Sequence, residues 1–410
     1  MSVDVAGADA AGMDADALRR AFGLLDAWVG DAVVPGAAAL VARHGQVAGT
    51  CYVGRAEPHT NRPVDAGAVF ALASITKPVT ATAVMQGVER GWFALDEPVG
   101  VLLPEFLDEP ASGRDVADRS TVTVRQLLTH TSGLPGFSVA NMRLRRRHAP
   151  LAEFVYSFQA APLFFAPGTA HLYSNCGILL LAELVGRGNA DTLGQRGQPS
   201  AILQYHEHVH RHILAPLGMN DTWIPVPEAA WERVAHVADT GQEGKDYEAA
   251  NSAYYRQLGI PWGGLFATAA DLARFTSIFM PDGQQLTDGN RVLTAASRAE
   301  MTRIQVSVPP AATDAAPGLR DSGAEAPWPR VDWGLGWEVK GRKTGHVSGD
   351  LTSPHTFSHI GVTGTLAWGD PVTGVMCILL ANRMQTSGWT TERPRRTLFS
   401  NAVMAAPVGA

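Results

Sequence analysis

Apolar residues recur along this chain with two different periods, and the changes of period mark the predicted elements. Helical spacing over residues 14–28 predicts an amphipathic helix near the N-terminus. Residues 36–54 form two apolar runs around a His-Gly pair, which is typical of two strands joined by a turn. From Ser74 onward the spacing is helical again, with Pro78 in the first turn, where a helix tolerates proline.

The middle of the chain has a mostly helical pattern, and strand patterns return toward its end. Helices are predicted within 124–134, 173–187, 202–219 and 267–280, and strands within 333–341, 357–370 and 373–383, before a closing helix at 394–406. Two further stretches, 186–200 and 308–329, have the composition of loops. The second is long enough to be a functional flap or a disordered segment.

Strand-rich ends around a helical middle predict an α+β fold. We expect an antiparallel sheet that is flanked by helices and formed from both chain ends, with a mostly helical lobe inserted between them. Residues 1–73 and 281–410 would form the sheet lobe, and residues 74–280 the helical lobe. The active site would lie between the two lobes.

The composition is that of an ordinary globular enzyme. Of 410 residues, 46% are hydrophobic and 18% charged, and a formal net charge of −6 gives no reason to expect nucleic acid or an anionic membrane as partner. The three widely spaced cysteines predict free, mostly buried thiols. The acidic N-terminus lacks the layout of a secretion signal, and the apolar runs are too short to span a membrane. We therefore expect a cytoplasmic protein.

The residues Ser74-Ile75-Thr76-Lys77 carry the first candidate chemistry. A serine hydroxyl is a weak nucleophile and needs a nearby base. Three positions of separation at a helix start place the hydroxyl of Ser74 and the amine of Lys77 on one face and within reach. The helix N-terminus also favours developing negative charge, and it should help to depress the pKa of a buried Lys77. This pattern predicts a serine nucleophile with a lysine base.

Further segments occur in a characteristic order after this motif. They are FALASITKPVTA, VRQLLTHTSGLPG, FAPGTAHLYSNCG, ILAPLGMNDTW, GGLFATAADLARF, WGLGWEV and SHIGVTGTLAWGD. Together they resemble the serine β-lactamase-related family, which includes class C β-lactamases, D-alanyl-D-alanine carboxypeptidases, family VIII carboxylesterases and related transesterases. The resemblance runs from about residue 20 to 400 and is most specific at the SxxK motif and at Tyr173-Ser174-Asn175.

The resemblance implies roles for two residues of the Tyr-Ser-Asn triplet. Tyr173 matches the family tyrosine that completes the base with Lys77, and its phenol would pass the proton of Ser74 to the leaving group. Asn175 matches the amide that steadies Lys77 and bonds the acyl side of the substrate. Which of Lys77 and Tyr173 accepts the first proton stays open.

The family's third motif is a Lys-Thr-Gly or His-Thr-Gly strand, for which this sequence offers two candidates. Lys343-Thr344-Gly345 matches the letters but has no strand pattern behind it. His359-Ile360-Gly361 departs at its middle residue, yet it is followed by the expected strands. We choose the second candidate because its context fits.

This choice implies an oxyanion hole and a substrate preference. Gly361 would let the substrate lie against the strand, and the N–H groups of Val362 and Ser74 would hold the oxyanion. With a reference pKa near 6.5, His359 would be mostly neutral at pH 7. Ile360 also lacks a hydroxyl that could bond a substrate carboxylate. Both departures favour neutral esters over β-lactams.

Other motifs have simpler interpretations. His206-Glu207-His208-Val209-His210 fits a zinc-protease pattern, but no convincing third ligand follows, so a solvated helix face is expected. A basic run begins at Arg143, and a solvated loop is its default interpretation, with a carboxylate or phosphate clamp as the alternative. Three tryptophans beside glycines, Trp262, Trp333 and Trp337, are expected in the core.

The sequence as a whole predicts a serine hydrolase or acyltransferase that forms an acyl-enzyme on Ser74 and needs no metal or organic cofactor. A carboxylesterase or transesterase for small esters or amides is the first hypothesis. A β-lactamase or D-Ala-D-Ala carboxypeptidase is the second, and a non-catalytic ligand-binding protein on the same fold is the third. The partners would be a small ester, amide or lactam and a second acyl acceptor. The oligomeric state stays open.

Overall fold

The main sheet combines strands from both ends of the chain. A computed structural model describes all residues except 111–114, 193–200, 283–285, 288, 312–329 and 410. The strands of the sheet are β1 (Ser2–Asp4), β2 (Gly36–Arg43), β3 (Gln46–Glu57), β4 (Arg62–Pro63), β8 (Val306–Val308), β9 (Val331–Trp333), β10 (Glu338–Val339), β11 (Phe357–Gly361), β12 (Thr365–Asp370) and β13 (Val375–Ala381). Their order is β1–β3–β2–β13–β12–β11–β10–β9–β8, with β4 beside β3, and every pair is antiparallel.

The centre of the sheet is where the two chain ends meet. Strands β2 and β13 pair from Ala37↔Ala381 to Arg43↔Val375. Every residue of β13 is buried, which explains why it has a continuous apolar run rather than an alternating one. The predicted antiparallel sheet formed from both chain ends is confirmed.

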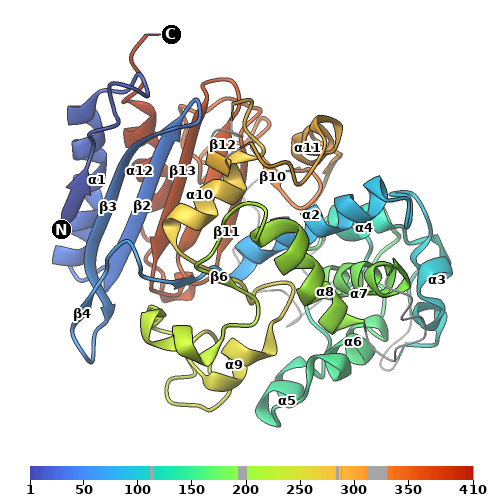
Figure 1. Cartoon of the computed structure of the whole chain (residues 1–410). Helices are drawn as coiled ribbons and strands as arrows, with labels where there is room; N and C mark the ends of the chain where they lie inside the picture. The colour runs from blue at the N-terminus through green and yellow to red at the C-terminus, as the bar shows by residue number, and fades with distance from the viewer. Residues whose placement is uncertain (111–114, 193–200, 283–285, 288, 312–329, 410) are drawn as a thin grey trace.

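Helices cover both faces of the sheet (Figure 1). They are α1 (Ala15–Gly30), α2 (Thr76–Glu89), α3 (Val99–Leu102), α4 (Val124–Leu128), α5 (Asn141–Arg146), α6 (Leu151–Gln159), α7 (Asn175–Thr192), α8 (Ile202–Val209), α9 (Ala253–Leu258), α10 (Ala269–Ser277), α11 (Ala295–Thr302) and α12 (Arg395–Met404). Helices α1 and α12 pack together on one face, and α10 packs on β2, β12 and β13 from the other.

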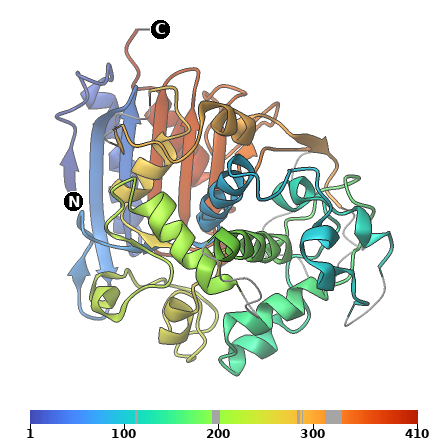
Figure 2. The same ribbon diagram turned by 45° about the vertical axis from the view of Figure 1, so that its right-hand side comes forward.

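The helices from α2 to α8 lie to one side of the main sheet, as Figures 1 and 2 both show. β11 is an inner strand between β12 and β10, and it contacts the turn before α2. A small second sheet links the two regions, since β5 (Phe70–Ala71) pairs with β7 (Phe266–Ala267), and β7 pairs with β6 (Thr222–Trp223). β5 ends just before the turn that holds Ser74. The main core therefore continues from the inner face of the sheet into the helices.

Local sequence signals explain where several elements begin. Asp14 caps α1 by accepting a hydrogen bond from the backbone N–H of Ala17 at 2.6 Å. Thr123 and Gln126 form a reciprocal capping box at the start of α4. The predicted strands around residues 44–45 and the predicted closing helix are also present as β2, β3 and α12.

Three predicted boundaries were wrong. The helix expected over 124–134 ends at Leu128, because His130 adopts a left-handed φ of 56° and the chain turns away. The loop expected over 186–200 is helical as far as Thr192, because α7 continues with a mostly buried face. Of the strand expected over 333–341, only Glu338–Val339 forms β10, after Trp333 has ended β9. The remainder of 186–200 and most of 308–329 lie outside the described residues.

Two further sequence expectations concern burial and length. All three cysteines are buried and unbridged, as predicted. Among the described helices, none combines the length and the apolar character that crossing a membrane requires.

Candidate functional site

Ser74 lies in a tight turn immediately before α2. The turn is a single 3-10 segment, Ala73–Ile75, and Ala73 has a left-handed φ of 47°, which is rare for a residue with a side chain. Thr76 fixes this geometry, since its hydroxyl donates to the Ala73 carbonyl at 2.6 Å and accepts the N–H of Leu265 at 3.0 Å. The serine is half-buried at the start of a helix, as the sequence predicted.

Lys77 is fully buried one turn after the serine. Its Nζ lies 2.9 Å from the Ser74 Oγ and donates to the carbonyl oxygen of Trp262 at 2.8 Å. The same Nζ lies 4.5 Å from the centre of the Tyr173 ring. The structure therefore brings the predicted nucleophile and its two predicted proton carriers together.

Tyr173 connects this pair to β11. Its hydroxyl lies 3.5 Å from Nε2 of His359, at the limit of a hydrogen bond. The other ring nitrogen of His359 lies 2.9 Å from the Ile360 carbonyl, which can only accept a hydrogen bond. Nδ1 therefore carries the proton, and Nε2 offers its lone pair to the Tyr173 hydroxyl.

His130 holds the segment that carries Tyr173, and the sequence analysis did not identify it. Its carbonyl accepts the N–H of Leu172 at 2.9 Å, and its Nδ1 accepts the N–H of Ser174 at 3.1 Å. Its ring centre lies 4.5 Å from that of Tyr173. The sequence carries no signal for this role, because the left-handed backbone of His130 is visible only in the structure.

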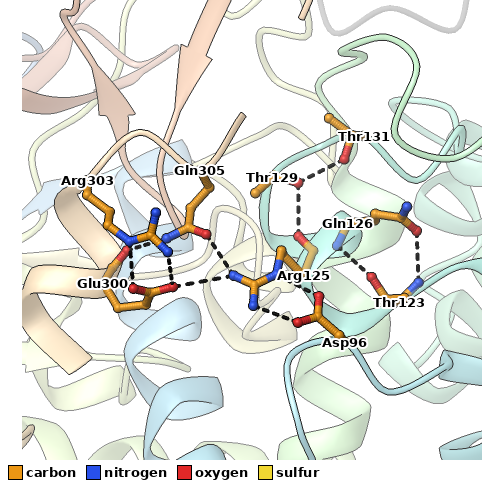
Figure 3. A network of polar contacts seen from close by, with 9 residues as sticks. All are labelled: Asp96, Thr123, Arg125, Gln126, Thr129, Thr131, Glu300, Arg303 and Gln305. Carbon is orange, nitrogen blue, oxygen red and sulfur yellow. Dashed lines mark hydrogen bonds and ion pairs between the residues drawn. The ribbon is translucent and has the colours of Figure 1, made fainter. Parts of the chain in front are cut away.

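A polar network anchors the loop that carries His130 (Figure 3). Arg125 bonds both carboxylate oxygens of Asp96, at 2.7 and 2.8 Å, and reaches Gln305 at 2.7 Å. The Arg125 carbonyl accepts the hydroxyl of Thr129, which also bonds that of Thr131 across His130. The turn at His130 is therefore tied to α4 and, through Arg125, to the segment before β8.

Asn175 is fully buried at the first position of α7. Its N–H donates to the Gly136 carbonyl at 3.0 Å, while the hydroxyl of the preceding Ser174 donates to the Pro135 carbonyl at 2.8 Å. The triplet is thus fastened to the loop that follows His130. That Asn175 steadies Lys77 stays a prediction.

The end of β11 approaches the chain just before the nucleophile. Thr363 donates its hydroxyl to the Ala71 carbonyl at 2.6 Å, and Thr365 donates to the Leu72 carbonyl at 3.0 Å. Val362 lies between these anchors and Gly361, so it is close to the Ser74 turn. The oxyanion role of its N–H stays a prediction.

Hydrogen bonds also hold the backbone carbonyls of Gly361 and Val362. Arg396 of α12 donates to the Gly361 carbonyl at 3.3 Å, and the N–H of Gln385 donates to the Val362 carbonyl at 2.7 Å. Burial lowers the pKa of Arg396 to about 10, so its guanidinium stays charged at neutral pH. The charged Arg396 polarises the Gly361 carbonyl, and with it the N–H of the same peptide unit, which belongs to Val362.

Gly361→Ala is expected to destabilise the protein by about 2 kcal/mol or more. A Cβ at this position would lie 2.2 Å from the Leu72 carbonyl oxygen and 2.1 Å from the Thr365 hydroxyl, so the strand or the nucleophile turn must move. Urea unfolding and ester turnover should both reveal the change. Gly345→Ala is the control, since a Cβ there meets no atom within 4 Å. The φ of Gly345 is 65°, so alanine still adds backbone strain, and the urea midpoint of this variant shows the cost of strain without a steric clash. An equal midpoint and turnover for Gly361→Ala would contradict the close approach.

In the alternative third motif, Lys343-Thr344-Gly345, the lysine forms structural hydrogen bonds. Lys343 is buried and bonds Glu338 at 2.7 Å, as well as the carbonyls of Asp332 and Val339. Burial alone would raise the pKa of Glu338, but Lys343 and His346 lower it. This lysine therefore serves as the counter-ion of a buried carboxylate.

Ile360 lies on the opposite face of β11 from His359. Its side chain packs against the core formed with α1 and α12. The expectation that its missing hydroxyl weakens carboxylate recognition therefore has no support in this geometry. Trp333 is buried, as expected, and its ring also borders the site, 6.0 Å from Tyr173 and 5.9 Å from His359.

Burial keeps several histidine rings neutral. The pKa of His359 falls to about 3, first because the ring is buried and then because Lys77 lies nearby. Burial likewise lowers the pKa of His171 to about 4 and of His208 to about 3, and it holds the pKa of His130 well below its usual value. At neutral pH these rings therefore carry no charge.

The free energy of unfolding is therefore expected to fall steeply in acid. Below a pH of about 6.5 the unfolded chain protonates these rings, whereas the folded protein keeps them neutral. The free energy of unfolding therefore falls as the pH drops from about 6.5 toward the folded-state pKa. The loss is about 1.4 kcal/mol per pH unit for each histidine between pH 6 and 4. Urea unfolding at pH 7, 6 and 5 measures it. His208→Gln should lower the slope by one histidine and the exposed His355→Gln should not, and equal slopes would contradict the prediction.

The zinc-protease pattern forms ordinary hydrogen bonds. Nε2 of His206 donates to the Gly259 carbonyl at 2.7 Å, and Nε2 of His208 bonds Gln86 at 2.8 Å. Both rings are at least partly buried, so the expected solvated helix face was wrong for them. Within the described residues, no group of three histidine, cysteine or acidic side chains is arranged to hold a metal ion.

Sequence comparisons find relatives with this chemistry. The Beta-lactamase family profile matches residues 19–400. Esterase EstB of Burkholderia gladioli is 38% identical over 197 residues, which are 45% of this chain and 46% of that esterase, so the match spans less than half of it. Penicillin-binding protein 4 of Amycolatopsis lactamdurans is 31% identical over 360 residues, which are 85% of this chain and 81% of that protein.

Solved structures share the fold over nearly the whole chain. A family VIII carboxylesterase superimposes with a TM-score of 0.73 at 21% identity, covering 99% of this chain and 100% of its own. A penicillin-binding protein homologue from Caulobacter crescentus gives a TM-score of 0.71 at 22% identity, with the same coverage.

Proposed function

Because this chain belongs to the beta-lactamase family of serine hydrolases, we propose that it is a carboxylesterase or transesterase that forms an acyl-enzyme on Ser74. Its substrates are small esters or amides. The observation that carries the proposal is the 2.9 Å contact between the Ser74 hydroxyl and the Nζ of buried Lys77, within reach of Tyr173.

The first half-reaction transfers the acyl group to the serine. Ser74 Oγ attacks the substrate carbonyl carbon, and its proton passes to the Lys77–Tyr173 pair. The carbonyl oxygen becomes an oxyanion, which the N–H groups of Ser74 and Val362 stabilise. Before the ester C–O bond breaks, the Tyr173 hydroxyl donates a hydrogen bond to His359 Nε2, which orients it. As the bond breaks, the hydroxyl leaves that acceptor and gives its proton to the leaving alkoxide.

The second half-reaction returns the serine. A water or alcohol attacks the acyl carbonyl carbon and gives its proton to the same pair. The bond between that carbon and Ser74 Oγ breaks, the pair returns the proton to Oγ, and an acid or a new ester is released. The chemistry uses side chains and backbone N–H groups alone.

The third motif favours neutral leaving groups. His359 is neutral near pH 7, since burial lowers its pKa to about 3. His359 therefore offers no positive charge to a substrate carboxylate. The likeness to an esterase over 197 residues supports the same preference, whereas the likeness to a penicillin-binding protein supports a β-lactam substrate as the second candidate.

The experiment compares turnover of p-nitrophenyl butyrate and nitrocefin and measures the mass of the trapped enzyme. We expect hydrolysis of the ester and a butyryl or fluorophosphonate adduct on the peptide that contains Ser74. Adding methanol during turnover would divide the acyl group between acid and methyl ester. Faster hydrolysis of nitrocefin would favour the second candidate, and absence of both activities and of the adduct would refute the proposal.

A further inference from the structure

Helix α5 presents two polar side chains to the interior of the protein. Its buried residues are Asn141, Leu144 and Arg145, which share one helical face, while Arg143 and Arg146 are exposed. Asn141 is 7% exposed and Arg145 is 8% exposed. The basic run is therefore a solvated surface only in part.

Polar atoms on this face lack hydrogen-bond partners within the part of the chain that the structure describes. These atoms are Nε of Arg145 and Oδ1 of Asn141, and both are buried. Among the same residues, no carboxylate forms an ion pair with Arg145, while the nearby Glu153 pairs with the exposed Arg147. A buried guanidinium without a counter-ion is costly, so a bound anion would stabilise it.

Two aromatic rings hold the guanidinium in place. Its Cζ lies 6.0 Å from the centre of the Phe137 ring and 5.6 Å from that of Tyr255, the second of which belongs to α9. Figures 1 and 2 both show α5 and α9 near each other, below the main sheet. Aromatic faces stabilise a cation and leave the N–H edge of its planar group for a ligand.

This group is connected to the nucleophile by short contacts. The Tyr255 hydroxyl donates to the Gly263 carbonyl at 3.2 Å, and a Cβ built on Gly263 would lie 3.7 Å from the carbonyl carbon of Ala73, next to Ser74.

A second route of contacts runs from Phe137. Its ring packs on Phe158 at 6.4 Å, and Phe158 packs on Trp262 at 5.1 Å, whose carbonyl accepts the Lys77 Nζ. Phe137 also follows Gly136, which accepts the Asn175 N–H, and Asn175 is the residue assigned to the acyl side of the substrate. Both routes place α5 behind the acyl side.

We propose that Arg145 and Asn141 bind a carboxylate at the far end of the substrate's acyl group. This inference rests on the proposed esterase function and names its substrate class, the half-esters of dicarboxylic acids. One guanidinium matches one carboxylate with two parallel N–H···O bonds. The Oδ1 of Asn141 can only accept a hydrogen bond, so its amide would turn Nδ2 toward the carboxylate as a further donor. The preference concerns the acyl group, so it is compatible with a neutral leaving group beside His359.

The test uses paired substrates that differ only in charge. They are the mono-p-nitrophenyl esters of adipic and suberic acid, each compared with the ester whose free carboxylate is replaced by a carboxamide. We expect the wild-type kcat/KM to be at least about tenfold higher for the carboxylate of the better-fitting length, mainly through a lower KM. Arg145→Gln should remove this preference and change carboxamide turnover by less than about threefold.

The matched control is Arg146→Gln, which makes the same change on an exposed neighbour of the same helix and should keep the preference. Arg145→Lys should restore part of it, because a lysine keeps the charge and loses the planar fork. If Arg145→Gln does not fold, Asn141→Ala and the wild-type preference still provide the test.

Several outcomes would overturn the inference. These are equal wild-type rates for both members of each pair, equal losses on both in Arg145→Gln, or the same loss in Arg146→Gln. Failure of the proposed function looks different, because then neither the carboxylate nor the carboxamide ester would acylate Ser74.

Discussion

Lys77→Met is expected to lower kcat/KM for p-nitrophenyl butyrate by about 10³- to 10⁴-fold. The Nζ of Lys77 lies 2.9 Å from the Ser74 hydroxyl and is a proposed proton acceptor, and methionine has a similar length without one. The folded state should tolerate this change, because it replaces a fully buried amine by an apolar chain. Steady-state kinetics and urea unfolding of the same preparation measure the two effects separately.

A double-variant cycle distinguishes a catalytic loss from a structural one. Ser74→Ala should lose at least as much activity as Lys77→Met, and the double variant should lose little more than Ser74→Ala alone, because the two residues act as one unit. Lys245→Met is the control, since it removes an exposed lysine. Activity of Lys77→Met within tenfold of the wild type, or additive losses in the double variant, would exclude Lys77 as the base.

The sequence predicted the parts of the fold that depend on local pattern. Continuous apolar runs became the buried strands β2 and β13, and the amphipathic run after Asp14 became α1. Where prediction failed, a contact distant in sequence decides the structure. The helix expected through His130 stops at Leu128, because His130 bonds a distant segment: its carbonyl accepts the N–H of Leu172, and its ring Nδ1 accepts the N–H of Ser174.

The candidate site divides in the same way. Ser74 and Lys77 could be identified because one helical turn brings them together, and Tyr173 because its triplet resembles a family motif. His130 and Arg396 could not, because their meaning depends on neighbours more than 30 positions away in the chain, such as Gly361 for Arg396. The basic run that contains Arg145 did suggest a carboxylate clamp, but the sequence could not single out Arg145, whose neighbour Tyr255 is distant in the chain. Helical spacing can predict that a residue is buried, but it cannot predict that its charge lacks a partner.

The partners of Lys343 and Lys77, the lysines of two candidate motifs, show why a motif match alone does not identify a catalytic lysine. Lys343 belongs to a Lys-Thr-Gly sequence, yet it is paired with the buried carboxylate of Glu338. Lys77 bonds a serine hydroxyl and a backbone carbonyl instead. Of the two, Lys77 is the one that lies beside a hydroxyl nucleophile, so its position and not the motif letters marks it as the candidate base.

Tyr173→Phe is expected to have a smaller effect on esters with good leaving groups than on alkyl esters. Phenylalanine keeps the ring over which Lys77 lies and removes the hydroxyl beside His359. A p-nitrophenolate leaves without needing a proton, whereas an ethoxide must receive one. We therefore expect about tenfold loss of kcat with p-nitrophenyl butyrate and about 10³-fold loss with ethyl butyrate, with KM nearly unchanged in both.

The ratio of the two losses identifies the role of the hydroxyl. Equal losses on both esters would mean that Tyr173 acts only on the Ser74 proton, and no loss on either would remove it from the mechanism. Tyr156→Phe is the control, because its side chain is 70% exposed. Since the pKa of His359 falls to about 3, this ring cannot supply the missing proton near pH 7, so its presence should not rescue ethyl butyrate turnover in Tyr173→Phe. The leaving-group dependence would therefore report on the Tyr173 hydroxyl itself.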